Sequence, residues 1–384
     1  MIQPSPSYIL THLGEDDAAD AAVSPPIYQT SNFCFGSFAE FRAALADEGH
    51  HRLYTRGNNP TVTLAEEKLA ALEHGERAKL VGSGVAAISH SIMAFVRSGD
   101  HVVCVDDAYS WTRTLLGGYL PRFGVETSFV DGADRAGLEQ AIRPTTKVIY
   151  LESPTSFTFR LQDLAAVAGI AAARGIRTIV DNTWATPIFC NPIDFGVDLV
   201  VHSASKYLGG HSDLVAGVIV GSAADIDRIQ QQEFMQLGTV ADPFMAWLLL
   251  RGMRTLQPRM AAHRTGALAV ARHLEAHPAV ESVLYPMLES HPDHELALRQ
   301  MRGGSGLLSF RLKGWDIGKV ERLTDALRLF KRAVSWGGYE SLVFPYAAGR
   351  AASADRVGLV RLHVGLEDSD ELIVDLDRAL AAAR

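Results

Sequence analysis

From Asn59 to Gly221 the sequence alternates between short apolar runs and segments of helical length, and this alternation is its strongest constraint on the fold. Most runs are apolar at successive positions, as strands buried on both faces are, and the longer segments imply right-handed crossovers between parallel strands. The sequence therefore predicts an α/β fold with a mostly parallel seven-stranded sheet. The predicted strands are Ala78 to Gly82, His101 to Asp106, Glu126 to Val130, Lys147 to Glu152, Thr178 to Asp181, Leu199 to Ser203 and Gly217 to Gly221.

The last connection in this series differs from the others because it is short. The segment from Lys206 to Ala216 has too few residues for an ordinary crossover helix. We therefore expect the seventh strand to run antiparallel to the sixth. At the start of the series, Asn59 and Pro60 open a predicted helix that ends before Gly75.

The chain is long enough for more than one domain, because its 384 residues exceed twice the roughly 150 residues of a typical domain. Residues 1–58 contain several prolines and show no sustained period, which favours an N-terminal arm. Residues 59–243 hold the predicted sheet and form the expected cofactor domain. Residues 244–384 are expected to form a smaller α+β C-terminal domain, with strand candidates at Val280 to Tyr285, Gly306 to Leu312 and Leu359 to Val364.

The charge balance and the cysteines exclude several classes of protein. A net charge of −8 leaves no basic surplus with which to bind nucleic acid or an anionic membrane. The three cysteines form no CxxC pair, which argues against a disulfide framework or a zinc site and favours a reducing compartment. No signal peptide or long apolar stretch occurs, so a cytoplasmic location is expected. No metal site is predicted, because His202, His211 and Asp213 lack ligand spacing.

Polar residues that follow the apolar runs are the first candidates for a site, because open parallel sheets bind ligands beyond the carboxyl ends of their strands. Asp181 ends one run and Lys206 follows the next, so we expect the acid and the amine to face one cleft. Gly84 begins a helix directly after a strand, which leaves backbone N–H groups available to an anion. Tyr109 follows another strand and adds an aromatic ring at the same edge.

One cofactor needs all of these groups together. Pyridoxal phosphate requires a lysine for its Schiff base, an aspartate for its pyridine nitrogen, a cup for its phosphate and an aromatic ring over its face. The residues that meet these needs are, in the same order, Lys206, Asp181, Gly84 with Ser203 and Ser205, and Tyr109. Taken singly, each has a plainer interpretation: Lys206 as a solvated loop lysine, Asp181 as a helix cap and Tyr109 as a packing aromatic. Their joint occurrence favours the cofactor.

Five segments of the chain resemble the Cys/Met metabolism family of pyridoxal-phosphate enzymes. They are YTRGNNPT at 54–61, DNTW at 181–184, SASKYLGGH at 203–211, SWGGYES at 335–341 and RLHVGLED at 361–368. They occur in the family's order and cover nearly the whole chain. The resemblance implies the PLP-dependent transferase fold of type I and pyridoxal 5'-phosphate as the cofactor.

The resemblance also assigns roles to individual residues. It implies that Lys206 carries the cofactor and acts as the general base, that Asp181 binds the pyridine nitrogen, and that Tyr109, also catalytic, stacks on the ring. Arg361 is expected to bind the substrate carboxylate through paired donors. The other residues implied are Ser203, Ser205, Gly84 and Val85 at the phosphate, Tyr54 and Arg56 at the phosphate from a neighbouring subunit, and Ser335 and Trp336 at the substrate pocket. A homotetramer, a dimer of dimers with shared active sites, is expected.

Within the family, the segments around Trp336 and His363 most resemble the bacterial cystathionine beta-lyases. The resemblance therefore predicts a carbon-sulfur lyase that cleaves L-cystathionine by beta-elimination to homocysteine, pyruvate and ammonia, a step of transsulfuration and methionine biosynthesis. The alternative is a gamma-lyase, gamma-synthase or sulfhydrylase of the same family, acting on cystathionine, methionine or an acyl-homoserine. A non-catalytic pyridoxal-phosphate-binding protein is the third interpretation.

Overall fold

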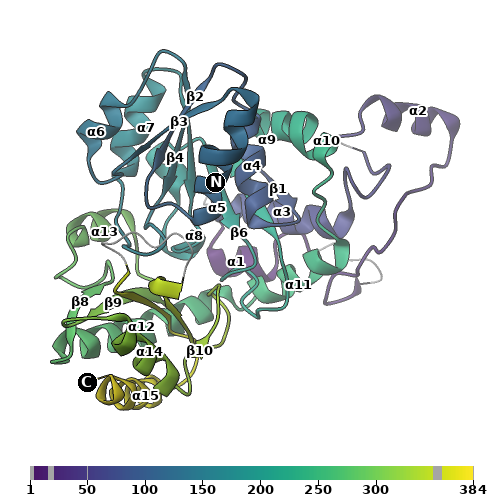
Figure 1. Ribbon diagram of the computed structural model, residues 1–384. Helices are drawn as coiled ribbons and strands as arrows, with labels where there is room; N and C mark the ends of the chain where they lie inside the picture. Colours follow the sequence, from purple (N-terminus) through teal and green to yellow (C-terminus); the bar gives the residue numbers. More distant parts are fainter. Residues whose placement is uncertain (1–3, 16–20, 50, 349–356, 384) are drawn as a thin grey trace.

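A seven-stranded sheet forms the centre of the computed structural model, which describes residues 4–15, 21–49, 51–348 and 357–383 (Figure 1). Its strand order is β1-β7-β6-β5-β4-β2-β3. The strands are β1 (Arg77–Val81), β2 (His101–Val105), β3 (Glu126–Val130), β4 (Thr146–Glu152), β5 (Arg177–Asp181), β6 (Leu199–Ser203) and β7 (Gly217–Gly221). All seven predicted strands are confirmed, and so is the α/β class.

The direction of the strands brings several strand ends to one edge of the sheet. The neighbouring pairs from β6 through β5, β4 and β2 to β3 are all parallel. β7 runs antiparallel to both β6 and β1, as the short connection before it predicts. The carboxyl ends of β2, β4, β5 and β6 therefore lie along the same edge.

Helices cover the sheet and keep its strands out of water. β2 and β7 are buried at every residue, which explains their unbroken apolar sequences. α3 (Pro60–Leu72) packs on β1, α4 (Gly84–Met93) on β6 and β7, and α7 (Leu164–Ala172) on β5. α3 begins as predicted, with the Asn59 side chain accepting from the Thr61 N–H.

The remaining helices around the sheet are short. They are α5 (Ser110–Thr114), α6 (Arg135–Gln140), α8 (Thr186–Phe189), α9 (Ala223–Ile229) and α10 (Met235–Leu237). Single turns of 3-10 or π-helix lie at η2 (Leu115–Tyr119), η3 (Leu120–Phe123), η4 (Pro192–Phe195), η5 (Gln230–Phe234) and η6 (Tyr346–Ala348).

A second sheet of five strands lies in the C-terminal part, in the order β10-β11-β12-β9-β8. Its strands are β8 (Val280–Leu284), β9 (Leu307–Leu312), β10 (Lys331–Arg332), β11 (Leu342–Pro345) and β12 (Leu359–His363). β8, β9 and β12 are the three strands predicted here. β10 and β11 were not predicted. β10 has only two residues, too few to show a period, and β11 is a short run that ends in a proline. The helices are α11 (Pro243–Met253), α12 (Leu256–Ala276), α13 (His294–Gln300), α14 (Ile317–Ala326) and α15 (Ser369–Ala382).

The N-terminal segment contains two helices that its sequence pattern did not predict. α1 (Pro6–Thr11) is only six residues long, too short for a period to be visible, and it buries Ile9 and Leu10 beside α3. α2 (Phe38–Ala46) stands apart from the rest of the chain (Figure 1) and leaves Phe38 79% exposed. Phe38, Phe41 and Leu45 recur at helical spacing in α2, but all three are exposed, and Ala44 is the one buried residue of this helix. The predicted domain limits at residues 58 and 243 stay predictions.

The described ranges contain neither a membrane-spanning helix nor a metal-binding cluster. No helix in them is long and apolar enough to cross a membrane. Within the same ranges, no group of three or more His, Cys, Asp or Glu side chains is arranged to hold a metal ion. The predicted cytoplasmic location stays a prediction.

Candidate active site

Lys206 lies in the turn after β6, and buried groups fix the position of that turn. The next residue, Tyr207, is fully buried, and its hydroxyl accepts from the Gly306 N–H at 2.9 Å. Arg259 donates at 2.8 Å to the carbonyl of Tyr207 and at 2.8 Å to that of Gly252, near the end of α11. Contacts with α11, with α12 and with the segment before β9 therefore hold the backbone from which the lysine projects.

The side chain of Lys206 meets the segment before β11. Its ammonium group donates to Oγ of Ser335 and lies 5.6 Å from the ring centroid of Trp336. Gly337 has a φ of +85°, and a Cβ there would lie 2.9 Å from the Cα of Lys206. His363 of β12 accepts from the Gly337 N–H at 3.1 Å. The structure thus brings Ser335 and Trp336 to Lys206, and only glycine at 337 allows the approach.

The amine of Lys206 loses its proton more readily than an ordinary lysine. Burial, followed by the positive charge of Arg361, lowers the pKa of Lys206 to about 8, while Asp181 acts in the opposite direction. The charge interactions of Lys206 with both Arg361 and Asp181 place the three residues in one site.

Asp181 ends β5 with one oxygen bound and the other open. Its Oδ1 accepts from the N–H of Thr183 at 3.0 Å and from the Thr183 hydroxyl at 2.5 Å. Its Oδ2 has no hydrogen-bond partner in the part of the chain that the structure describes. Burial raises the pKa of Asp181, and the bonds from Thr183 oppose that rise. The geometry leaves one carboxylate oxygen free to pair with a protonated ring nitrogen.

The start of α4 and the end of β6 together form a cup for an anion. Ser83 caps the helix by accepting from the N–H of Ala86, so the N–H groups of Gly84 and Val85 are directed away from the helix. A Cβ at position 84 would lie 2.9 Å from Oγ of Ser203. Glycine at 84 therefore lets the Ser203 hydroxyl and the helix start converge on one point.

Ser205 uses its hydroxyl to close the loop before β7. The hydroxyl donates to the carbonyl of Ala216 at 3.2 Å and accepts from the Ala216 N–H at 3.0 Å. Its single proton is therefore already committed to the chain. A contact of Ser205 with the phosphate stays a prediction and requires that bond to be exchanged.

Tyr109 stands at the same edge, between two acids and an arginine. It precedes α5, and its side chain is 39% exposed. Burial raises the pKa of Tyr109, as do the negative charges of Glu152 and Asp181, whereas Arg361 lowers it. The phenol is therefore protonated at neutral pH. Sequence analysis did not single out Glu152, although it ends β4 just as Asp181 ends β5.

Arg361 lies on β12 with its guanidinium between two aromatic rings. The Cζ atom is 4.6 Å from the ring centroid of Phe157 and 5.2 Å from that of Phe344. Within the described ranges its donors find one acceptor, the carbonyl of Ser156 at 3.5 Å. Burial lowers the pKa of Arg361 to about 10, so the side chain is charged at neutral pH. Most of its donors are thus free for a carboxylate. Sequence analysis missed Phe157, which lies in a loop without any pattern.

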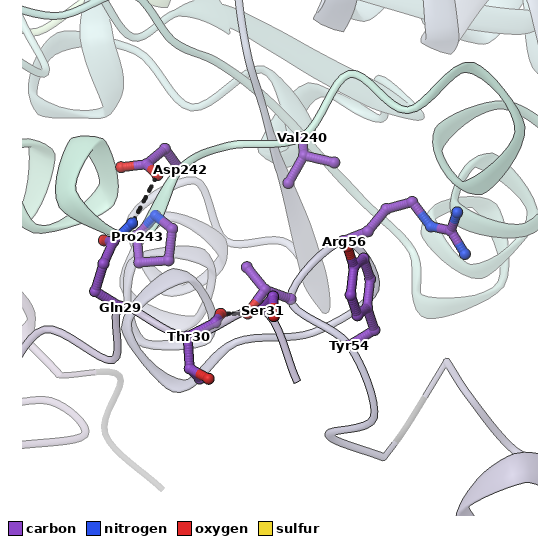
Figure 2. Close-up of a pocket in the computed structure, with 9 residues that line it drawn as sticks. Gln29, Thr30, Ser31, Tyr54, Arg56, Val240, Asp242 and Pro243 are labelled. Atoms are coloured by element: carbon purple, nitrogen blue, oxygen red, sulfur yellow. Dashed lines mark hydrogen bonds between the residues drawn. The ribbon is translucent and has the colours of Figure 1, made fainter. Parts of the chain in front are cut away.

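Tyr54 and Arg56 lie away from Lys206 within the chain. They line a cavity of about 380 Å³ together with residues of the N-terminal segment and the start of α11. Figure 2 shows the guanidinium of Arg56 extending away from Gln29 and Asp242. Arg56 lies 3.8 Å from Glu48 and 5.9 Å from the Tyr54 ring. No hydrogen bond or ion pair in the described ranges joins either residue to Lys206 or Asp181 of the same chain.

The parallel sheet and the groups at its edge define a class of protein, the pyridoxal-phosphate-dependent enzymes of fold type I. The model of the Cys/Met metabolism PLP-dependent enzymes matches residues 8–381. The chain belongs to this family, and pyridoxal phosphate is its cofactor. The free oxygen of Asp181, the amine of Lys206 and the cup at Gly84 fit that group.

Named relatives correct the predicted reaction. The chain is 42% identical to the L-methionine gamma-lyase of Treponema denticola, covering 96% of this chain and 95% of the relative. It is 42% identical to the L-methionine gamma-lyase of Pseudomonas putida, with coverage of 94% and 93%, and 41% identical to the cystathionine gamma-lyase of Bacillus subtilis, with coverage of 95% and 96%. The prediction of beta-elimination is therefore wrong, and the gamma-lyase alternative is supported. The short motifs misled because they bind groups that both reactions use.

Proposed function

We propose that this protein is a carbon-sulfur lyase that cleaves L-methionine and similar thioether amino acids by gamma-elimination, releasing a thiol, 2-oxobutyrate and ammonia. The observation that carries the proposal is the identity of 42% with an L-methionine gamma-lyase over nearly the full length of both chains. The rings of Phe157, Phe344 and Tyr346 add support, because Phe157 contacts both of the others and makes an apolar wall beside Arg361. An apolar thioether side chain suits such a wall.

Six groups of the chain would hold the cofactor. We assign the covalent link to Lys206, the pyridine nitrogen to the free oxygen of Asp181 and the stacking contact to the ring of Tyr109. The phosphate is assigned to the N–H groups of Gly84 and Val85, together with the hydroxyl of the adjacent Ser203 at the end of β6. When bound, pyridoxal phosphate accepts the electron pair left at the substrate's alpha carbon.

A second copy of the chain would complete the phosphate site. Tyr54 is 48% exposed, and within the described ranges Arg56 contacts the Tyr54 ring and makes a long, exposed ion pair with Glu48. Both side chains are therefore free to reach a neighbouring subunit's cup at Gly84, and the proposed assembly is a homotetramer built from such pairs.

Arg361 would orient the substrate and Lys206 would move its protons. The free donors of Arg361 bind the alpha-carboxylate, which places the alpha hydrogen near the amine of Lys206. Lys206, neutral once the substrate amine has replaced it, removes the alpha proton. Gamma-elimination then needs a proton to leave the beta carbon before the bond between the gamma carbon and sulfur breaks. Lys206, having released the first proton to solvent, would accept this second proton and later return it to the gamma carbon. The protonated phenol of Tyr109 donates a proton to the departing thiolate, and water releases 2-oxobutyrate and ammonia.

Identification of the keto acid tests the proposal. The purified enzyme, loaded with pyridoxal phosphate, is incubated separately with L-methionine and with L,L-cystathionine, and the products are separated by chromatography. We expect 2-oxobutyrate from both, with methanethiol from methionine and cysteine from cystathionine. Pyruvate as the main keto acid, or no keto acid from either substrate, would contradict gamma-elimination. Lys206→Ala protein is the control for cofactor-only chemistry.

A further inference from the structure

Glu152 is a buried acid at the active-site edge to which the proposed reaction gives no role. It is the last residue of β4 and is only 6% exposed. Its register partner on β5 is Asp181, so two carboxylates stand side by side at the carboxyl ends of neighbouring strands. Burying a second negative charge there is unfavourable unless its oxygens are bound. Both oxygens of Glu152 accept hydrogen bonds.

One oxygen of Glu152 holds the backbone of Tyr109. Its Oε2 accepts from the Tyr109 N–H at 2.7 Å. Tyr109 stands at the N-cap position of α5, and no side-chain hydrogen bond caps that helix. The ring itself is 39% exposed and makes no hydrogen bond in the described ranges. The place of the ring over the cofactor site therefore depends on how its backbone is held.

The other oxygen holds the turn that faces Arg361. Oε1 accepts from the hydroxyl of Ser156, and the carbonyl of Ser156 accepts in turn from Arg361 at 3.5 Å. The next residue, Phe157, places its ring 4.6 Å from the guanidinium carbon of Arg361. Movement of this turn would thus move the groups that orient the arginine.

The same turn has a second anchor, Asp107, which lies two residues before Tyr109. Asp107 accepts from the N–H of Thr158 at 3.2 Å and from the hydroxyl of Thr155 at 3.0 Å. These bonds hold Thr155 and Thr158 of the turn. The hydroxyl of Ser156 is bound by Glu152 instead. Asp107 thus joins the turn to the segment that leads into Tyr109, whereas Glu152 joins Ser156 of the turn directly to the Tyr109 N–H.

We propose that Glu152 is a positioning residue: its two oxygens hold the ring of Tyr109 and the turn beside Arg361 in one fixed arrangement. Glu152 thereby links the position of Tyr109, which is proposed to contact the cofactor, to the position of Arg361, which is proposed to bind the substrate carboxylate. This inference rests on the proposed site and not on which carbon-sulfur bond breaks. The tests of Glu152 therefore stay valid if the enzyme yields pyruvate. That outcome would contradict gamma-elimination but not the positioning role of Glu152.

Two substitutions of Glu152 separate hydrogen bonding from charge. Glu152→Gln keeps an acceptor for the Tyr109 N–H and offers an amide donor to Ser156, while it removes the negative charge. Glu152→Ala removes both bonds. A third variant, Ser156→Ala, breaks only the bond to the turn. Asp375→Ala is the matched control. Asp375 is also a buried carboxylate that accepts from backbone N–H groups, at Arg328 and Leu329, but it lies on the C-terminal helix α15.

Three measurements on the holoenzymes are needed: the visible circular dichroism of bound pyridoxal phosphate, the dissociation constant of glycine by spectral titration, and the melting temperature. Glycine has the alpha-carboxylate and the alpha-amine but no leaving group, so its binding reports on the carboxylate contact and on amine exchange at Lys206 without carbon-sulfur cleavage. For Glu152→Ala we expect a weakened dichroic band and glycine binding about tenfold weaker. Glu152→Gln should stay within about twofold of the wild type. Ser156→Ala should weaken glycine binding with little change in the band.

Two results would overturn the proposal. One is Glu152→Ala protein with a wild-type band and wild-type glycine affinity, and a lowered melting temperature like that of Asp375→Ala, which indicates a purely structural role. The other is Glu152→Gln protein as impaired as Glu152→Ala, which indicates that the charge matters rather than the two hydrogen bonds. If Glu152→Ala does not fold, Glu152→Gln must match the wild type and Ser156→Ala must weaken glycine binding; failure of either overturns the proposal.

Discussion

The surroundings of Lys206 explain why one lysine among many becomes reactive. It is largely enclosed, Arg361 adds a nearby positive charge, and the combined effect lowers its pKa to about 8. Asp181 opposes this effect but does not reverse it. A neutral amine is the form that attacks a carbonyl carbon, so the fold prepares Lys206 to take up its cofactor close to neutral pH.

Removal of the amine should abolish both cofactor attachment and turnover. Lys206→Ala deletes the group proposed to link the cofactor and to move protons, so we expect kcat to fall by at least about 10³-fold. The near-visible absorbance of attached pyridoxal phosphate should disappear as well. Lys147→Ala, at an exposed position, is the matched control and should behave as wild type. Normal turnover by Lys206→Ala protein would refute the assignment.

The low pKa of Lys206 makes cofactor uptake depend on pH in a defined direction. Below about pH 8 the folded apoenzyme carries an ammonium at 206, which cannot attack, and above it a neutral amine, which can. The attachment rate, followed by absorbance after pyridoxal phosphate is mixed with apoenzyme, should therefore rise through about pH 8. Arg361→Leu removes the cation that lowers the pKa, so its midpoint should lie at higher pH. An unchanged midpoint in that variant would contradict the electrostatic explanation.

At the scale of elements, the site depends on the close contact between the segment before β11 and the turn after β6 that carries Lys206. The segment before β11 rests on the turn that carries Lys206, and β12 holds that segment through His363. β5 and β6 supply the acid and the lysine, while β11 and β12 of the second sheet supply Phe344 and Arg361 as register partners. The active site is therefore built where the two sheets' elements meet.

A methyl group at position 337 should disturb this contact selectively. In Gly337→Ala the positive φ costs about 1 kcal/mol, and the new Cβ also meets the backbone of Lys206. We expect a lower melting temperature together with a loss of kcat of more than about tenfold. Gly99→Ala is the control, because Gly99 has a φ of +91° with nothing within 4 Å. It should lose similar stability and keep its kcat; equal kcat in both variants would show that the contact is unimportant.

At the scale of the whole molecule, the chain leaves groups exposed that a second copy could use. α2 stands away from the body with apolar side chains in solvent (Figure 1), and Tyr54 and Arg56 border an open cavity (Figure 2). The proposed homotetramer would cover such surfaces and would place the partner's Arg56 at the phosphate cup of each site.

Mixing two inactive variants tests whether sites are shared between subunits. Arg56→Ala and Lys206→Ala proteins are combined in equal amounts under conditions that exchange subunits. A hybrid pair then has one site with both residues intact, so random exchange should restore about a quarter of the wild-type activity. Unmixed variants treated in the same way are the controls. No recovery despite mass-spectrometric proof of exchange would count against a shared site.

The sequence by itself determined the central sheet, its strand directions and the principal residues of the candidate site. These follow from local patterns, because strands buried on both faces are apolar throughout and the crossover length decides parallel or antiparallel entry. Asp181, Lys206 and Tyr109 could be selected because ligands bind at the carboxyl ends of parallel strands.

Only the tertiary structure decided which distant residues meet. β11 became visible through its pairing with β12, and α2 became visible as a helix although nearly all of its residues are exposed. Glu152 binds Tyr109 across 43 residues, and the contact of Phe157 with Arg361 joins the two sheets' loops; no spacing in the sequence encodes either contact. The reaction itself was mispredicted from short motifs for a related reason. The motifs record how cofactor and carboxylate are held, whereas the choice between beta- and gamma-cleavage depends on the shape of a pocket assembled from many separate segments.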